Sequence, residues 1–361
     1  MKKLIFSVFT FSLALLFALS GCSCTATPPL TFNDAYLGEK SVSGNYYSET
    51  LEYSVESESS YQTITKSAGV DQTKVPKYTG TYVVYFSNAN NSLPDINTNI
   101  NYDENDFHYI KSVLSLSFTV NEITYNDQIV SEVYFYSNEY SLAPVYSKTT
   151  MKYTYFVIGS EQKLSQVIYQ YSTVYNKANF KTTKTYYAPS DNEDINNIDL
   201  TNTNINNASD PSYFNTEKLK PFLNGTDTYE YTVRTAIDNN QLMFAIRNSN
   251  LGSATIPTVS YSYDKPIDIV AQNKNNANIT INQLEYNGQT KVNVNMPVKN
   301  VEFYINSTTN RGSSKYMSIQ KEAVDGINNN ALIVEYAEPL LSGLSTIGAL
   351  VYRLNKVTIN N

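Results

Sequence analysis

The sequence has few of the residues from which enzyme active sites are most often built. Its 361 residues include no tryptophan, one histidine and two cysteines. Zinc sites need clusters of histidine and cysteine, and a Ser-His-Asp triad would have to use His108, with no Gly-x-Ser-x-Gly stretch to support it. The sequence does not exclude a pair of carboxylates placed for glycoside hydrolysis, but sugar clefts usually contain tryptophan, which this chain lacks. We therefore predict a protein that is not an enzyme and that uses no metal and no cofactor.

Basic residues and phosphate-binding motifs are also scarce. Lysine and arginine together number 26, against 33 acidic residues. Neither Gly-x-Gly-x-x-Gly nor Gly-x4-Gly-Lys-Ser/Thr occurs in the chain. An acidic surface repels phosphate groups, so nucleic acid is excluded as a predicted partner.

Long apolar runs are missing except at the N-terminus. A short positive region, Met1-Lys2-Lys3, precedes the almost wholly apolar residues 4–19 and a small-residue site at Ser20-Gly21. This run is short for a membrane-spanning helix, which takes about 20 residues. Residues 1–21 are therefore predicted to be a signal peptide, whose removal leaves 24 basic against 33 acidic residues and a net charge of −9.

The order Leu19-Ser20-Gly21-Cys22 resembles the lipobox of bacterial lipoproteins, and the resemblance covers only these residues and the signal before them. In that family the cysteine sulfur carries a diacylglycerol and becomes the new amino terminus. The resemblance implies a protein anchored through Cys22 to the outer, extracytoplasmic face of the cell membrane, where two acyl chains hold far better than one. Cys24 then has no disulfide partner. We interpret it as an incidental residue, with a second acylation or a reactive thiol as alternatives.

The rest of the chain is predicted to be organised around strands. After the signal peptide we expect a flexible tether and then a β-rich domain, either continuous or in two halves joined by an Asn/Asp-rich crossover. The predicted boundaries are 22–40 for the tether, 41–361 for the domain, 41–188 and 226–361 for the halves, and 189–225 for the crossover.

Tyrosine is abundant, with 32 residues, and apolar and polar residues alternate along several segments. Both features favour antiparallel sheet with one face exposed to solvent. The segment "KVNVNMPV", for example, predicts that Val292, Val294, Met296 and Val298 share one face. Similar patterns occur in "LSLSFTV" at 114–120, "MKYTYFV" at 151–157 and "VIYQYSTVY" at 167–175. Further candidate strands are 43–56, 79–87, 128–137, 179–187, 227–234, 277–286, 300–306, 314–320, 331–337 and 347–359.

Two local signals interrupt the strands. Asn-Gly at 287–288 predicts a tight hairpin turn. In residues 238–247, Asp238 and Gln241 have the spacing of a capping box, followed by an apolar stripe of Leu242, Ala245 and Ile246. This pattern predicts a helix against a sheet face, and a weaker helix is expected from Thr216 to near Pro221.

The succession of a helix and then strands over residues 226–361 is similar to the half-barrel, LolA-like envelope lipoproteins. That resemblance implies a curled antiparallel sheet that cups short helices over an apolar cavity. It carries no individual binding residue. The fold class predicted for the whole body is thus mostly β, a large curved antiparallel sheet with one or two short helices packed on it.

Candidate ligand-binding residues come from tyrosines that recur on two predicted strands. Tyr153, Tyr155, Tyr169 and Tyr171 could line a groove, since each ring offers an apolar face and a hydroxyl. The alternative is that these rings only pack the sheet.

Other polar groups are expected to have no chemical role. His108, which follows Asp103, Glu104 and Asp106, is interpreted as a polar surface residue rather than a general base or metal ligand. The acidic stretches around 103–106 and 191–199 contain oxygen ligands that calcium uses, but neither matches a calcium-loop motif.

These features predict a membrane-anchored, non-enzymatic lipoprotein that binds or carries an apolar or amphipathic ligand. The alternative is a cell-surface scaffold or adhesion module that presents its tyrosine-rich sheet to cell wall or to a partner protein. An exported hydrolase is the third hypothesis.

Overall fold

The computed structural model describes twelve stretches of the chain. They are 47–91, 107–120, 122–138, 141–158, 162–176, 181–187, 225–230, 236–248, 253–259, 266–306, 314–342 and 345–360. The predicted signal peptide, the tether with Cys22 and Cys24, and the predicted helix from Thr216 lie outside these stretches. So do the acidic residues of 103–106 and 191–199 and nearly all of the predicted crossover.

Strands make up most of the described chain. The first eight strands of the main sheet are β1 (Ser48–Glu58), β4 (Thr79–Asn91), β5 (Phe107–Val120), β6 (Ile123–Asn138), β7 (Ser141–Ile158), β8 (Gln162–Asn176), β9 (Lys181–Tyr187) and β10 (Gly225–Glu230). The other seven are β11 (Ile237–Asp238), β12 (Ser253–Val259), β13 (Ile267–Tyr286), β14 (Gln289–Ile305), β15 (Lys315–Gln320), β16 (Ile333–Ser342) and β17 (Ser345–Asn360). A small hairpin of β2 (Ser60–Tyr61) and β3 (Ile64–Thr65) stands apart, the helix is α5 (Leu242–Asn248), and short 3-10 turns are η1 (Gln72–Lys74) and η5 (Asn239–Gln241).

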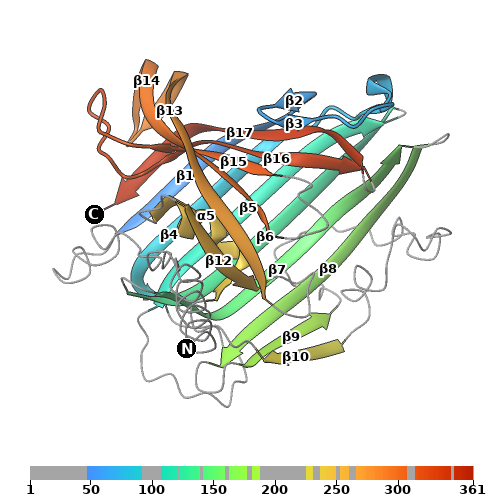
Figure 1. Cartoon of the computed structure of the whole chain (residues 1–361), viewed down its shortest axis with the longest axis horizontal. Coiled ribbons are helices and arrows are strands. Elements are labelled where there is room, and N and C mark those ends of the chain that lie inside the picture. The colour runs from blue at the N-terminus through green and yellow to red at the C-terminus, as the bar shows by residue number, and fades with distance from the viewer. Residues whose placement is uncertain are drawn as a thin grey trace, which may run out of the picture.

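The main sheet contains strands from both halves of the sequence. Its order is β10-β9-β8-β7-β6-β5-β4-β1-β17-β16-β15-β14-β13-β12-β11, and β1 joins the halves by pairing with β17. Neighbours in this order are antiparallel except β11 and β12, and β13 makes a further parallel pairing with β17. Strands β13 to β17 thereby form a closed group, the closed strands. Strands β4 to β8 extend from them as a curved wall. Figure 1 shows α5 in the space between this wall and the closed strands.

The predicted fold class is therefore confirmed: the protein is mostly β, with one large curved antiparallel sheet and, in the described part of the chain, a single short α-helix. No helix among the described residues has both the length and the apolar character needed to cross a membrane.

Among the described residues, alternation along the strands predicts most of the buried faces, with a clear exception in β14. In β5, Leu116, Phe118 and Val120 are buried, as expected. In β14, however, Val292 is 67% exposed although the next alternate residues, Val294 and beyond, are buried. Asn293, between Val292 and Val294, has a positive φ of 52° and so departs from the extended backbone of a regular strand. The prediction that Val292 shares the buried face was wrong.

Two of the predicted strands are one. Residues 291–298 and 300–306 were expected as separate strands, but β14 runs from Gln289 to Ile305 without a break. Strand β12, residues 253–259, was not predicted. Its sequence SATIPTV contains a proline that weakens the strand signal.

Both local signals lead to the expected structures. Asn287 and Gly288 have φ values of 50° and 77°, the two positive angles of a tight hairpin turn between β13 and β14. Asp238 caps the helical segment with a complete capping box that includes Gln241. The segment differs from the prediction only in beginning with a 3-10 turn, η5, before α5.

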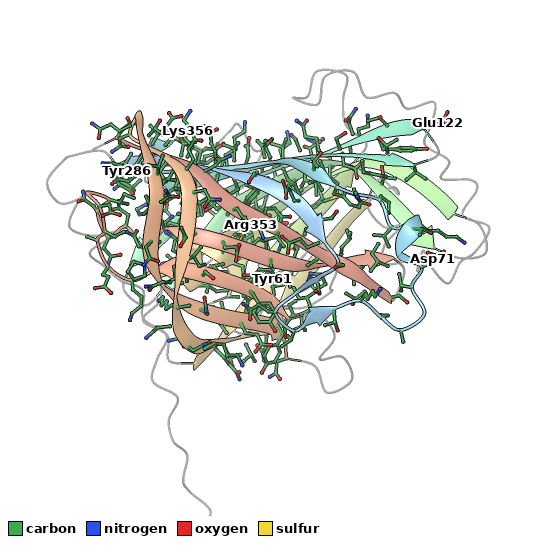
Figure 2. The ribbon with its side chains drawn as sticks, turned by 90° about the horizontal axis from the view of Figure 1, so that it is seen from above. Tyr61, Asp71, Glu122, Tyr286, Arg353 and Lys356 are labelled. Carbon is green, nitrogen blue, oxygen red and sulfur yellow. The ribbon has the colours of Figure 1, made fainter. Side chains whose placement is uncertain are left out.

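The β2–β3 hairpin covers the outer face of the closed strands. Its residue Ile64 is buried with Ala349 and Val351, and Tyr61 packs against this group. Figure 2 shows Tyr61 close to Arg353, and both bind Glu335. Because Tyr352 alternates with Val351, it points to the opposite, inner face of the sheet.

Candidate binding cavity

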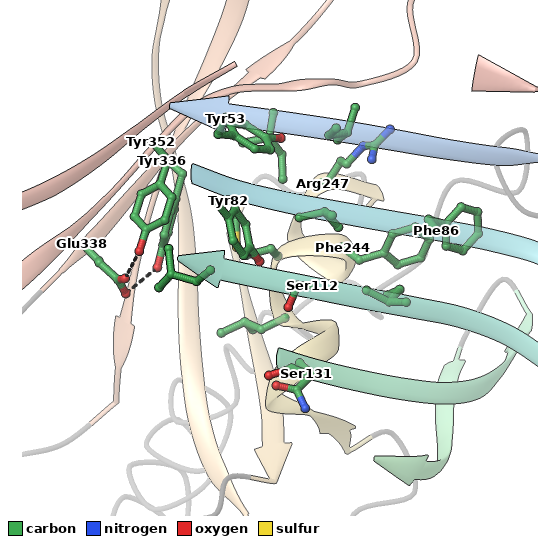
Figure 3. A pocket seen from close by; sticks show the side chains of 18 of the residues that line it. Tyr53, Tyr82, Phe86, Ser112, Ser131, Phe244, Arg247, Tyr336, Glu338 and Tyr352 are labelled. Atoms are coloured by element: carbon green, nitrogen blue, oxygen red, sulfur yellow. Dashed lines mark hydrogen bonds between the residues drawn. The ribbon is translucent and has the colours of Figure 1, made fainter. Parts of the chain in front are cut away.

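A cavity of about 240 Å³ lies between α5, the curved wall and the closed strands (Figure 3). Alternate residues of neighbouring strands β4 and β5 form much of the wall, since side chains two apart share a face. The register places these residues opposite one another in three pairs: Tyr82 with Leu114, Val84 with Ser112, and Phe86 with Ile110. The wall is thus mainly apolar, with hydroxyls at defined places.

Helix α5 closes one side of the cavity and is held there by a buried polar network. Asp238 accepts hydrogen bonds from the hydroxyls of Ser147, at 2.5 Å, and of Tyr175. Gln241 accepts from the backbone N–H of Asp238 at 2.9 Å and donates to the carbonyl of Leu142 at 3.2 Å. The capping residues therefore tie the helix to strands β7 and β8.

Aromatic rings pack α5 against the wall. The ring of Phe244 lies 4.7 Å from that of Phe86 and 5.8 Å from that of Phe135. His108 belongs to the same layer, because its ring stacks on Phe135 at 5.4 Å and lies parallel to Phe86 at 6.2 Å. The interpretation of His108 as a surface residue was wrong: its side chain is partly buried among aromatic rings.

A buried ion pair lies at the C-terminal end of α5. The guanidinium of Arg247 forms two bonds with the carboxylate of Glu49, that from Nη2 being 2.9 Å long. Arg247 also donates to the backbone carbonyls of Ala331 at 2.8 Å and Asn330 at 2.7 Å, and the hydroxyl of Tyr47 donates to Glu49 at 2.9 Å. The side chains of Arg247 and Glu49 are 3% and 1% exposed, so this pair is shielded from water.

A second charged group lies on the opposite wall. The carboxylate of Glu338 accepts hydrogen bonds from the hydroxyls of Tyr352 at 2.6 Å and Tyr336 at 2.9 Å, and from Lys315 Nζ at 2.8 Å. Burial by itself would raise the pKa of the Glu338 carboxyl, but the charge and hydrogen bond of Lys315, together with the tyrosine hydroxyls, lower that pKa below its ordinary value. Glu338 is therefore an ionised carboxylate with three hydrogen-bond donors around it.

Two further tyrosines face each other across β1 and β4, with ring centroids 5.8 Å apart. The hydroxyl of Tyr53 is buried and has no hydrogen-bond partner among the described residues. The hydroxyl of Tyr82 contacts the sulfur of Met243 at 3.9 Å. Burial raises the pKa of Tyr53 far above its ordinary value and that of Tyr82 to about 12, so both phenols keep their protons.

The predicted ligand-binding tyrosines lie elsewhere in the sheet. Tyr153 and Tyr155 are on β7, and Tyr169 and Tyr171 are on β8. The side chains of Tyr153, Tyr155 and Tyr169 are outside the described part of the structure. Tyr171 is buried and does not line the cavity. Their role in binding stays a prediction.

Sequence reasoning missed the polar residues of the cavity. One signal was present: Glu49 alternates with Leu51, Tyr53 and Val55 on the apolar face of a predicted strand. A carboxylate in such a position needs a buried cation, because an unpaired charge in the interior is costly. Nothing in the local sequence indicates that Arg247 is that cation. Among the described residues, no group of three or more His, Cys, Asp or Glu side chains could hold a metal ion.

Comparisons with known proteins identify no family for this chain. No family model matches the chain, and no curated protein matches it. The chain is similar to a solved structure from Brucella abortus, described as a beta-barrel-like protein of the domain of unknown function DUF1849, with 7% sequence identity and a TM-score of 0.47. The match covers 87% of this chain and 98% of that one.

Proposed function

We propose that the protein is a non-enzymatic, lipid-anchored extracytoplasmic protein that binds a small apolar or amphipathic molecule in the cavity between α5 and the sheet. The observation that carries this proposal is the cavity itself, about 240 Å³ in volume and lined mainly by apolar side chains of β4, β5 and α5. Pockets for small molecules are typically concave, apolar and equipped with a few polar groups.

The state of the carboxylates in the cavity supports binding rather than catalysis. Glu49 is paired with Arg247, and Glu338 with Lys315 and two tyrosine hydroxyls. A general base needs a carboxylate free to take a proton from its substrate. Both carboxylates instead accept hydrogen bonds from neighbouring side chains. This arrangement favours a cavity that holds a ligand without reacting with it.

The binding proposal can be tested by filling the cavity. Val84→Phe adds a ring to the cavity wall, and we expect it to reduce the amount of apolar small molecule that copurifies with the protein at least tenfold. Val83→Phe is the matched control, because Val83 is the neighbouring half-buried residue on the opposite face of β4. Solvent extraction of the purified proteins and mass spectrometry would measure the bound molecule. Equal recovery from both variants, or none from the unmodified protein, would contradict the proposal.

The anchoring part of the proposal predicts that Cys22 carries acyl chains. Cells fed radiolabelled palmitate should label the protein and retain it in the membrane fraction. Cys22→Ser should abolish both the label and the membrane retention, whereas Cys24→Ser should leave them unchanged. A labelled Cys22→Ser variant would show that the anchor is elsewhere.

A scaffold function is the second candidate, and one feature of the sheet favours it. Because Ile110 lines the cavity, its neighbour Tyr109 points to the opposite face. There the rings of Tyr85, Tyr109, Tyr134 and Tyr146 follow one another across four strands, with centroids 6.1, 4.7 and 6.2 Å apart. This tyrosine ladder is half-buried over its first three rings. A scaffold would be crosslinked to a partner through these rings and would retain no small molecule.

A further inference from the structure

We infer that the cavity selects an uncharged ligand with one hydrogen-bond-accepting oxygen on an apolar body, and that the hydroxyl of Tyr53 donates to that oxygen. The inference rests on the proposed binding function and adds to it the chemical class of the ligand. Small alcohols, ketones and esters with short hydrocarbon chains belong to this class, whereas free fatty acid anions and pure hydrocarbons do not.

The charges in the wall balance. The ionised side chains that line the cavity form two pairs, Glu49 with Arg247 and Glu338 with Lys315. The hydrogen bonds of Arg247 already go to Glu49 and to two backbone carbonyls. A charged ligand would therefore lose its water and find no counter-ion that is not already bound, which is unfavourable. This arrangement favours a neutral molecule.

One buried polar group on the wall lacks a partner. The side chain of Tyr53 is 1% exposed, and its hydroxyl forms no hydrogen bond with the described residues. Buried polar groups in proteins are nearly always hydrogen-bonded, so an exception calls for an explanation. In Figure 3 Tyr53 lies in the cavity wall, on the strand next to that of Tyr82. An acceptor atom brought by the ligand would satisfy its hydroxyl.

The hydroxyl of Tyr53 acts as a hydrogen-bond donor. Burial raises the pKa of the Tyr53 phenol, so it stays protonated across the physiological range and offers its O–H. The neighbouring hydroxyl of Tyr82 contacts the weakly accepting sulfur of Met243 at 3.9 Å and forms a side-chain hydrogen bond with Ser112. The ligand must therefore supply an acceptor.

The size of the cavity limits the apolar body. A volume of 240 Å³ equals that of about eight water molecules at roughly 30 Å³ each. A hydrocarbon chain of about eight carbon atoms is of similar size, so 1-octanol is a suitable probe, with octane and octanoate as its uncharged apolar and anionic counterparts.

The test is calorimetric titration of the full-length protein with these three probes, each against a blank of the same buffer and detergent. We expect 1-octanol to bind about tenfold more tightly than either octane or octanoate, as one hydrogen bond made in a buried site predicts. Tyr53→Phe should abolish the advantage of 1-octanol and leave the affinity for octane unchanged. Unchanged octane binding also shows that the variant is folded.

Tyr85→Phe is the matched control, because it removes a hydroxyl from the opposite face of β4 and should change none of the three affinities. If the unmodified protein bound octane and 1-octanol equally, or octanoate most tightly, the inference would be overturned while the binding function stood. The same conclusion would follow if Tyr53→Phe kept the preference for 1-octanol. If none of the probes bound, the proposed binding function itself would fail.

Discussion

The free energy of unfolding should fall by at least about 4 kcal/mol between pH 9 and pH 11. Three buried tyrosines of the cavity, Tyr53, Tyr336 and Tyr352, have pKa values raised well above the ordinary 10.0, chiefly because burial disfavours the phenolate. Tyr336 and Tyr352 are raised further by the negative charge of Glu338. In the unfolded chain the same phenols ionise near pH 10.

Proton linkage explains why stability falls as the pH rises. Below pH 10 the phenols are protonated in both the folded and the unfolded state, so they contribute fully to the free energy of unfolding. Above pH 10 the unfolded chain releases these protons and the folded protein does not, so rising pH favours unfolding until the raised folded pKa is reached. Between pH 10 and pH 11 each buried phenol lowers the free energy of unfolding by about 1.4 kcal/mol, so the three together lower it by about 4 kcal/mol at pH 11.

Urea unfolding at pH 9, 10 and 11 would measure this loss, and tyrosinate absorbance at 295 nm would report ionisation. We expect a cooperative rise in absorbance that coincides with unfolding and is reversed on return to pH 8. Tyr53→Phe should lose about 1.4 kcal/mol less than the unmodified protein over the same interval. A free energy of unfolding that did not change between pH 9 and pH 11 would mean that these rings are accessible to water.

Arg247→Met should lower the free energy of unfolding by about 3 to 5 kcal/mol, because it leaves the carboxylate of Glu49 buried without its cation. It also removes the two bonds by which the end of α5 holds the carbonyls of Asn330 and Ala331. Urea unfolding at pH 7 would measure the loss.

The double variant Glu49→Leu/Arg247→Met separates the charge effect from lost packing. Because apolar residues can replace a buried ion pair with little loss, we expect the double variant to recover most of the stability that Arg247→Met loses. Arg353→Met is a control, since its ion pairs with Glu58 and Glu335 are partly exposed and should contribute about 1 kcal/mol or less. Equal losses for Arg247→Met and Arg353→Met would contradict a buried, shielded pair.

The class of the fold and several of its parts could be predicted from local sequence. Alternation in segments such as 114–120 identifies strands with one buried face, because side chains two apart always share a face. Asn287-Gly288 predicts its turn because both residues tolerate positive φ. Asp238 and Gln241 predict the start of a helix because each satisfies a backbone group of the other. Where backbone geometry departs from the regular pleat, as at Asn293, the pattern failed.

The sequence by itself thus determined a β-rich body with one capped helix, and it predicts, through Cys22, where that body is anchored. Only the tertiary structure decided that β1 pairs with β17, and that Glu49 meets Arg247 although 198 positions separate them. The physical reason is that alternation specifies which face of a strand is apolar but not which strand lies beside it. The cavity depends on that second choice, because its wall is assembled from neighbours that are distant along the chain.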